Sequence, residues 1–183
     1  ERYVDEKIVT FLGRITFQKG PDYFVEAAAK VLKRVPNVRF VMAGSGDMMN
    51  KMIDLVAHRG IADKFHFPGF MRGRQVQEVL ADSDVYIMPS VSEPFGISPL
   101  EAMQVGCPSI ISHQSGCAEI LSHVIKTDYW DIDAMADAIY AIVKYPAMYK
   151  SLRELGRDEV NNIKWYDVGL KVRRIYDMVI SGC

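Results

Sequence analysis

Short, continuously apolar segments alternate with segments of helical periodicity along almost the whole chain. Because these strands are apolar on both faces and are separated by helices, the pattern predicts a parallel sheet covered on both sides. The expected fold is α/β, with a doubly wound, Rossmann-like parallel sheet. The predicted strands are Lys7–Gly13, Val38–Gly44, Lys64–Gly69, Asp84–Ser90, Pro108–Ser112 and His123–Asp128. The predicted helices are Pro21–Val35, Met48–Arg59, Gln75–Ala81, Ser98–Val105, Ile132–Lys144, Met148–Asn161 and Tyr166–Ile180.

The bulk composition fits one domain over residues 1–183, with 49% hydrophobic residues and a net charge of −1. The lack of a basic field argues against nucleic acid as a partner. No transmembrane segment is expected, because no apolar run approaches the ~20 residues that span a bilayer. The cysteines have no metal-binding spacing, which favours a reducing, cytoplasmic setting, with peripheral association at the inner face of a membrane as an open alternative. The chain opens on Glu1 rather than methionine, which indicates a fragment.

The stretch "SEPFGISPLEAM" places Glu93 and Glu101 directly after a predicted strand. Pro94, Gly96 and Pro99 prevent one helix from running through both glutamates. Glu93 is therefore expected on a loop, and Glu101 in the first turn of the helix that follows. The simpler alternatives are a solvated loop carboxylate and a capping residue.

The start of that helix matches a capping box, with Ser98 at the N-cap, proline at the first position and Glu101 three residues on. The backbone N–H groups before such a helix are expected to lie at its N-terminus, where anions bind. These N–H groups belong to Phe95, Gly96, Ile97 and Ser98.

Two cations follow the first predicted strand in "GRITFQKGP". Arg14 and Lys19 flank a short loop beside a helix N-terminus, an arrangement that suits a diphosphate. The alternative is two ordinary surface cations. Gly44 ends the next strand in "AGSGD", a tight turn that matches neither the dinucleotide-binding nor the Walker A pattern. The "DID" stretch at Asp131 precedes a helical pattern, so helix capping is favoured over metal binding.

Taken together, these segments resemble the C-terminal, donor-binding half of a retaining GT-B glycosyltransferase of glycosyltransferase family 4, which is glycogen synthase-like. The resemblance covers nearly the whole chain. Its most specific element is "EPFGISPLE", two glutamates separated by seven residues. The other matching segments are "FLGRITFQKGPDYFVEAA", "VMAGSGD", "FPGFM", "DVYIMPSV" and "WYDVGLKVRRIYDMV".

The resemblance implies a role for each matching residue. Arg14 and Lys19 would bind the donor diphosphate, and Glu93 would bind hydroxyls of the donor sugar. Glu101 would bind the ribose, and the turn at 69–71 would hold the base through its backbone. The full set of implied donor contacts is Gly13, Gly44, Phe70, Met71, Phe95, Gly96, Ile97, Ser98 and Glu101.

The resemblance also implies the partners of the chain. The donor would be a UDP-, ADP- or GDP-sugar, with no further cofactor and no metal. The acceptor, a sugar, glycan or lipid, would bind an N-terminal domain that is absent from this chain, so the chain alone would transfer poorly or not at all. Two other functions stay open: a non-catalytic nucleotide-sugar-binding module, and a sugar-nucleotide epimerase of GT-B type.

Overall fold

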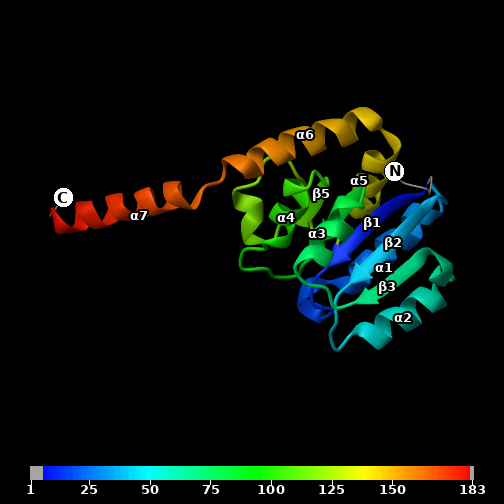
Figure 1. The fold of residues 1–183 in the computed structure, drawn as a ribbon. Helices are drawn as coiled ribbons and strands as arrows, with labels where there is room; N and C mark the ends of the chain where they lie inside the picture. The colour runs from blue at the N-terminus through cyan, green and yellow to red at the C-terminus, as the bar shows by residue number, and fades with distance from the viewer. Residues whose placement is uncertain (1–5, 182–183) are drawn as a thin grey trace.

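The computed structural model describes residues 6–181, apart from the side chain of Trp165, and forms a six-stranded sheet flanked by helices (Figure 1). All neighbouring strands are parallel, in the order β3-β2-β1-β4-β5-β6. The predicted doubly wound parallel sheet is confirmed.

Each predicted strand and helix is present, with small shifts at the ends. The strands are β1 (Lys7–Leu12), β2 (Val38–Ala43), β3 (Phe65–Gly69), β4 (Val85–Met88), β5 (Ser109–Ser112) and β6 (Ile125–Thr127). The helices are α1 (Pro21–Leu32), α2 (Met49–His58), α3 (Arg74–Ala81), α4 (Ser98–Gln104), α5 (Ile132–Lys144), α6 (Pro146–Asn162) and α7 (Trp165–Ile180). One-turn 3₁₀ segments, not predicted, occur at η1 (Phe17–Lys19), η2 (Ala62–Lys64) and η3 (Gly116–Glu119).

Alternate residues of the central strands enter two different cores. In β4, Ile87 packs into a core shared with α1, α2 and α5. Its neighbour Tyr86 packs into a second core with residues of α3 and α4. Because successive side chains of a strand point to opposite faces, a strand buried on both sides must be apolar throughout. Helices therefore cover both faces of the sheet.

The strand order reverses between β1 and β4, which lie side by side although more than seventy residues separate their pairing residues Val9 and Val85. In a doubly wound sheet the loops at the carboxyl ends of two such strands diverge and leave a crevice. The loops after β1 and β4 are therefore the first place to look for a functional site.

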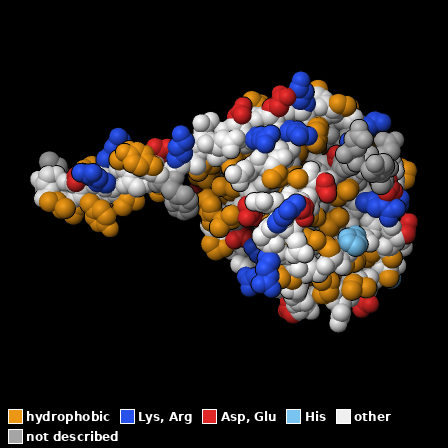
Figure 2. Space-filling model, viewed as in Figure 1, with side chains coloured by type: hydrophobic (Ala, Val, Ile, Leu, Met, Phe, Trp, Pro, Cys, Tyr) orange, Lys and Arg blue, Asp and Glu red, His pale blue; other side chains and the backbone are white. Residues whose placement is uncertain are grey.

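Helix α7 extends away from the body of the protein, and hydrophobic side chains lie along it (Figures 1 and 2). The exposed apolar residues include a stripe with the three- and four-residue spacing of one helix face. The stripe consists of Val168, Val172, Ile175 and Val179, which are 45–72% exposed. Among the described residues, no helix is both long and apolar enough to cross a membrane.

Candidate functional site

The loop after β1 is pressed against the end of β4. Gly13 continues the β1 ladder by donating its N–H to the carbonyl of Ala43 at 3.0 Å. Lys19 ends the turn η1, and Gly20 follows in the left-handed region with φ 64°. A Cβ atom at Gly20 would lie 2.1 Å from the carbonyl oxygen of Pro89, so only glycine allows this approach. The loop therefore delivers Lys19 to the carboxyl end of β4.

The loop after β4 is tied to the loop after β5. Glu93 donates its N–H to the carbonyl of Gln114 at 3.2 Å, and its own carbonyl accepts the N–H of Gly116 at 2.9 Å. Its carboxylate forms an ion pair with the ammonium of Lys19, and the two side chains are 12% and 20% exposed. The structure thus joins Lys19 and Glu93, which the resemblance places with Arg14 in the catalytic set. Arg14 is exposed and donates to Gln18 Oε1 at 3.4 Å.

The predicted capping box is wrong. Helix α4 begins at Ser98, so Ile97 occupies the N-cap position, and no side chain caps the helix. The Ser98 hydroxyl instead receives a hydrogen bond of 2.8 Å from the hydroxyl of Tyr86. Tyr86 is completely buried, and burial raises the pKa of its hydroxyl, which stays protonated and needs an acceptor. Ser98 meets that need, and the Glu101 side chain is not used in a cap.

The backbone before α4 offers donors to a ligand. Within residues 6–181, the N–H groups of Phe95, Gly96, Ile97 and Ser98 have no hydrogen-bond acceptor. The carbonyl of Phe95 accepts the N–H of Cys117 at 2.8 Å, which fixes the loop in place. Unpaired N–H groups beside a cation are suited to an anion.

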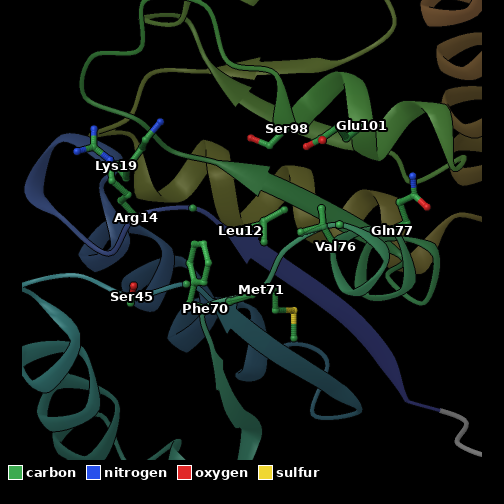
Figure 3. A pocket seen from close by; sticks show the side chains of 14 residues that line it. Leu12, Arg14, Lys19, Ser45, Phe70, Met71, Val76, Gln77, Ser98 and Glu101 are labelled. Atoms are coloured by element: carbon green, nitrogen blue, oxygen red, sulfur yellow. The ribbon is translucent and has the colours of Figure 1, made fainter.

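One cavity of about 650 Å³ gathers most of the predicted residues from loops that are distant in sequence (Figure 3). The predicted residues that line it are Gly13, Arg14, Lys19, Gly44, Phe70, Met71, Ser98 and Glu101. Glu93 is not a lining residue, but it contacts Lys19, which is. Phe95, Gly96 and Ile97 lie on the loop before Ser98 and do not line this cavity, so the structure does not place all predicted donor contacts at its wall.

Six further lining residues were not predicted as site residues: Leu12, Ala43, Ser45, Gly73, Val76 and Gln77. Ser45 belongs to the "GSGD" turn, whose position after a strand was the available signal. Val76 and Gln77 lie on α3, and only the tertiary packing shows which face of that helix meets the cavity.

The turn after β2 approaches the turn after β1 very closely. A Cβ atom at Gly44 would lie 1.8 Å from the carbonyl oxygen of Gly13, and the φ of Gly44 is +145°. Only glycine at this position lets the turn after β2 approach the turn after β1 so closely. Gly44 therefore has a steric role in holding the two turns together, and its predicted contact with a phosphate stays a prediction.

Comparison with known proteins shows what the chain is similar to. The family model described as "Glycosyl transferases group 1" matches residues 1–159. A 2-deoxystreptamine N-acetyl-D-glucosaminyltransferase of Niallia circulans is 31% identical over 85% of this chain. The match covers 41% of that relative, and the chain spans less than half the length of the curated relatives it matches.

Solved structures share the fold. The C-terminal domain of a group 1 glycosyl transferase family protein from Francisella tularensis superposes with a TM-score of 0.80, at 23% identity and 86% coverage of both chains. HepE of Anabaena, solved in complex with UDP and glucose, superposes with a TM-score of 0.82 at 19% identity. That match covers 97% of this chain and 49% of HepE.

Proposed function

This chain belongs to the group 1 glycosyl transferases, and from that membership we propose that it binds a nucleoside-diphosphate sugar in the cavity between β1, β2, α3 and α4. The observation that carries the proposal is the convergence of Arg14, Lys19 and Glu101 on one cavity. Two cations suit a diphosphate, and a carboxylate suits the paired hydroxyls of a ribose. The chain alone is the donor-binding domain of a larger enzyme.

The cavity has distinct walls for the parts of the donor. Phe70, Met71 and Glu101 line the cavity. In the proposal, Phe70 and Met71 form the wall for the base, and Glu101 binds the ribose. Gly13 and Gly44 bring the two turns close enough for the backbone to approach a phosphate. In the proposal, the unpaired backbone N–H groups of Phe95, Gly96, Ile97 and Ser98 provide further hydrogen-bond donors for the sugar end of the nucleotide sugar.

The proposed reaction breaks the bond between the anomeric carbon and the diphosphate oxygen. The oxygen of the acceptor hydroxyl forms the new bond to the anomeric carbon, and its proton passes to the departing diphosphate. Negative charge develops on the leaving diphosphate, where Arg14 and Lys19 stabilise it. Removing one such contact costs about 3 kcal/mol in the transition state. Because these cations and N–H groups can offset that charge, we expect transfer without a bound metal. Retention of configuration is expected from the resemblance to the retaining hexosyltransferases of this family.

Glu93 is assigned to the donor sugar. Its carboxylate is nearly buried and paired with Lys19, next to the cavity. A carboxylate in that position accepts hydrogen bonds from sugar hydroxyls and orients the ring. Glu93 is therefore a positioning group for the transferred sugar and not a covalent nucleophile.

A second, acceptor-binding domain completes the enzyme in this proposal. The chain spans less than half of its curated relatives, and the apolar stripe on α7 offers a face for further packing. The acceptor, a sugar, glycan or lipid, would bind that domain, and closure of the cleft would exclude water. Cys117 is a buried free cysteine, which fits the proposed reducing, cytoplasmic location.

A thermal-shift screen with UDP, ADP and GDP tests the proposal, with UDP the first choice because HepE, of the same fold, binds it. A nucleotide at about 100 times its Kd should add about 2.7 kcal/mol of stability. Arg14→Ala should abolish the shift. Arg74→Ala removes an exposed arginine outside the cavity and should leave the shift unchanged. No shift with any of the three nucleotides would overturn the proposal.

A further inference from the structure

Two hydroxyl groups in sequence lead from the core of the sheet into the donor cavity. The first belongs to Tyr86 of β4, which is completely buried in the core that includes residues of α3 and α4. Its hydroxyl donates to the Ser98 hydroxyl, with the two oxygens 2.8 Å apart. Ser98 is the first residue of α4 and lines the cavity together with Arg14 and Lys19 (Figure 3). One hydrogen bond therefore connects the core to the wall of the donor site.

The burial of Tyr86 determines the direction of this hydrogen bond. Burial raises the pKa of the Tyr86 hydroxyl, so that the phenol keeps its proton at neutral pH. A buried hydroxyl proton needs an acceptor, and within residues 6–181 the Ser98 hydroxyl is the acceptor that it reaches. Tyr86 is therefore the donor of the pair, and Ser98 Oγ is the acceptor.

The direction of that bond determines what Ser98 can offer to a ligand. A serine hydroxyl has one proton to donate and two lone pairs that accept. Since Tyr86 donates to one lone pair, the proton of Ser98 has to point away from the tyrosine. In the part of the chain that the structure describes, this proton is donated to no acceptor. The Ser98 side chain is half-buried on the cavity wall, so its proton is available to a bound ligand.

The polar groups around Ser98 favour one kind of ligand atom. The backbone N–H groups of residues 95–98 are also donors without an acceptor among the described residues. Arg14 and Lys19, which line the same cavity, have side chains that can only donate. The carboxylate of Glu101 is the acceptor on this wall, and the proposed function assigns it to the ribose. Donors from two loops favour an anionic oxygen over a sugar hydroxyl, which brings a proton of its own.

We propose that Tyr86 is a positioning residue of the donor site, because its hydroxyl fixes Ser98 as a hydrogen-bond donor to the diphosphate. Tyr86 is buried beneath Ser98 and acts only through it. Hydrogen bonds in a chain polarise one another, so the bond from Tyr86 strengthens the bond from Ser98 to an anionic oxygen. The assignment of that oxygen to the diphosphate rests on the proposed function, whereas the orientation of Ser98 by Tyr86 rests on the geometry alone.

The test measures the affinities of UDP and uridine by NMR titration in Tyr86→Phe, Ser98→Ala and Ser98→Thr. Ser98→Ala should weaken UDP about tenfold, the loss expected for a hydrogen bond to a charged oxygen. Tyr86→Phe should weaken UDP about threefold, because the Ser98 bond stays but loses its orientation and polarisation. Ser98→Thr keeps the hydroxyl and should restore most of the affinity that Ser98→Ala loses. In the Ser98→Ala background, adding Tyr86→Phe should weaken UDP no further.

Uridine distinguishes the orientation of Ser98 from a displacement of α4. It lacks the diphosphate but keeps the ribose, which the proposed function assigns to Glu101 on the same helix. Tyr86→Phe should therefore leave the affinity for uridine unchanged, whereas a shift of α4 would weaken uridine and UDP alike. Tyr149→Phe is the matched control, since it removes a tyrosine hydroxyl that accepts from Arg153 at 3.2 Å, outside the donor cavity. It should change neither affinity.

The outcomes separate this inference from the proposed function. If Tyr86→Phe weakens uridine as much as UDP, or weakens UDP equally in the Ser98→Ala background, its role is structural and the inference is overturned. If it weakens UDP-glucose but not UDP, Ser98 donates to the sugar, and the assignment to the diphosphate is wrong. Unchanged UDP binding in Tyr86→Phe, with binding still lost in Arg14→Ala, would overturn the inference and leave the donor site in place. A wild-type chain that binds no nucleotide would overturn both.

Discussion

The ammonium of Lys19 and the carboxylate of Glu93 form an ion pair that joins the loop after β1 to the loop after β4, across 74 residues of sequence. Both side chains are largely buried, at 20% and 12% exposure. The ion pair therefore connects the loops that follow β1 and β4, the two neighbouring strands between which the strand order reverses. In the proposed function, Lys19 turns to the diphosphate and Glu93 to the sugar, so donor binding must loosen this pair.

Glu93→Gln should therefore leave UDP binding equal to or tighter than that of the wild type, because Lys19 loses its competing partner. Lys19→Ala should weaken UDP binding and lower stability by about 1–3 kcal/mol, because it leaves a buried carboxylate unpaired. Calorimetry and urea unfolding measure the two effects. The double variant Lys19→Ala/Glu93→Gln should regain the stability that is lost in Lys19→Ala, but it should not regain the affinity for UDP. If it recovers both, the pair has no role in the donor site.

Glu101→Ala should weaken UDP binding about ten- to a hundredfold, the loss expected for a hydrogen bond to a charged acceptor. Glu101 lines the cavity and takes no part in a cap, so its removal should cost little stability. Glu93→Ala is the comparison: it should lower the preference for UDP-sugar over UDP without weakening UDP itself. Equal losses of UDP affinity in the two variants would contradict this division of roles.

Gly44→Ala should destabilise the fold by about 1–3 kcal/mol, because the new Cβ would overlap the carbonyl of Gly13. Gly60→Ala is the control: its φ is also positive, at +69°, but no atom lies within 4 Å of the added Cβ. It should cost only the backbone strain, about 1–2 kcal/mol. Chemical denaturation compares the two, and UDP binding should be lost in Gly44→Ala alone. Retained UDP binding in Gly44→Ala would show that the two turns need not meet.

The contribution of Glu159 to the free energy of unfolding should decrease as the pH falls into the acid range. Burial alone raises the pKa of its carboxyl, but the amides of Ser122 and His123, at 2.7 and 2.9 Å, together with the His123 ring, outweigh burial and lower the pKa. A depressed folded-state pKa contributes stability above the unfolded value, about 4.3, and loses it as the pH falls through the folded value. Glu159→Gln should therefore cost about 1–2 kcal/mol at pH 7 and little at the acid end. A pH-independent difference in urea unfolding would contradict this.

The architecture could be predicted because it depends on local patterns. A strand such as Val85–Met88 is apolar at every position, and this signals burial on both faces before any tertiary contact is known. Arg14, Lys19 and Glu101 could also be predicted to meet, since the carboxyl ends of parallel strands share one edge. The cap at Asp131 was likewise confirmed, because capping is local.

The features that were predicted wrongly or missed depend on contacts between residues that are far apart in the sequence. The sequence around Ser98 matches a capping box, but in the structure the Ser98 hydroxyl accepts a hydrogen bond from the buried hydroxyl of Tyr86. No pattern near Ser98 reports that partner. The Lys19–Glu93 ion pair and the contribution of Gln77 to the cavity likewise depend on packing between elements far apart in sequence.

The central claim is that the cavity at the carboxyl ends of β1, β2 and β3, beside α3 and α4, binds the nucleoside diphosphate. Mapping by NMR the backbone amides that UDP perturbs tests this claim most directly. The account predicts that the largest shifts fall on Gly13, Arg14, Gly44 and Ser45 and on the loop from Phe95 to Ser98. A second cavity, of about 570 Å³, is lined by Lys30, Lys33, His58 and Arg59 together with Glu26, which is ion-paired with Arg59. Its lysines make it the competing place for a phosphate. Shifts confined to that second cavity, with residues 13, 14 and 44 unmoved, would contradict the account.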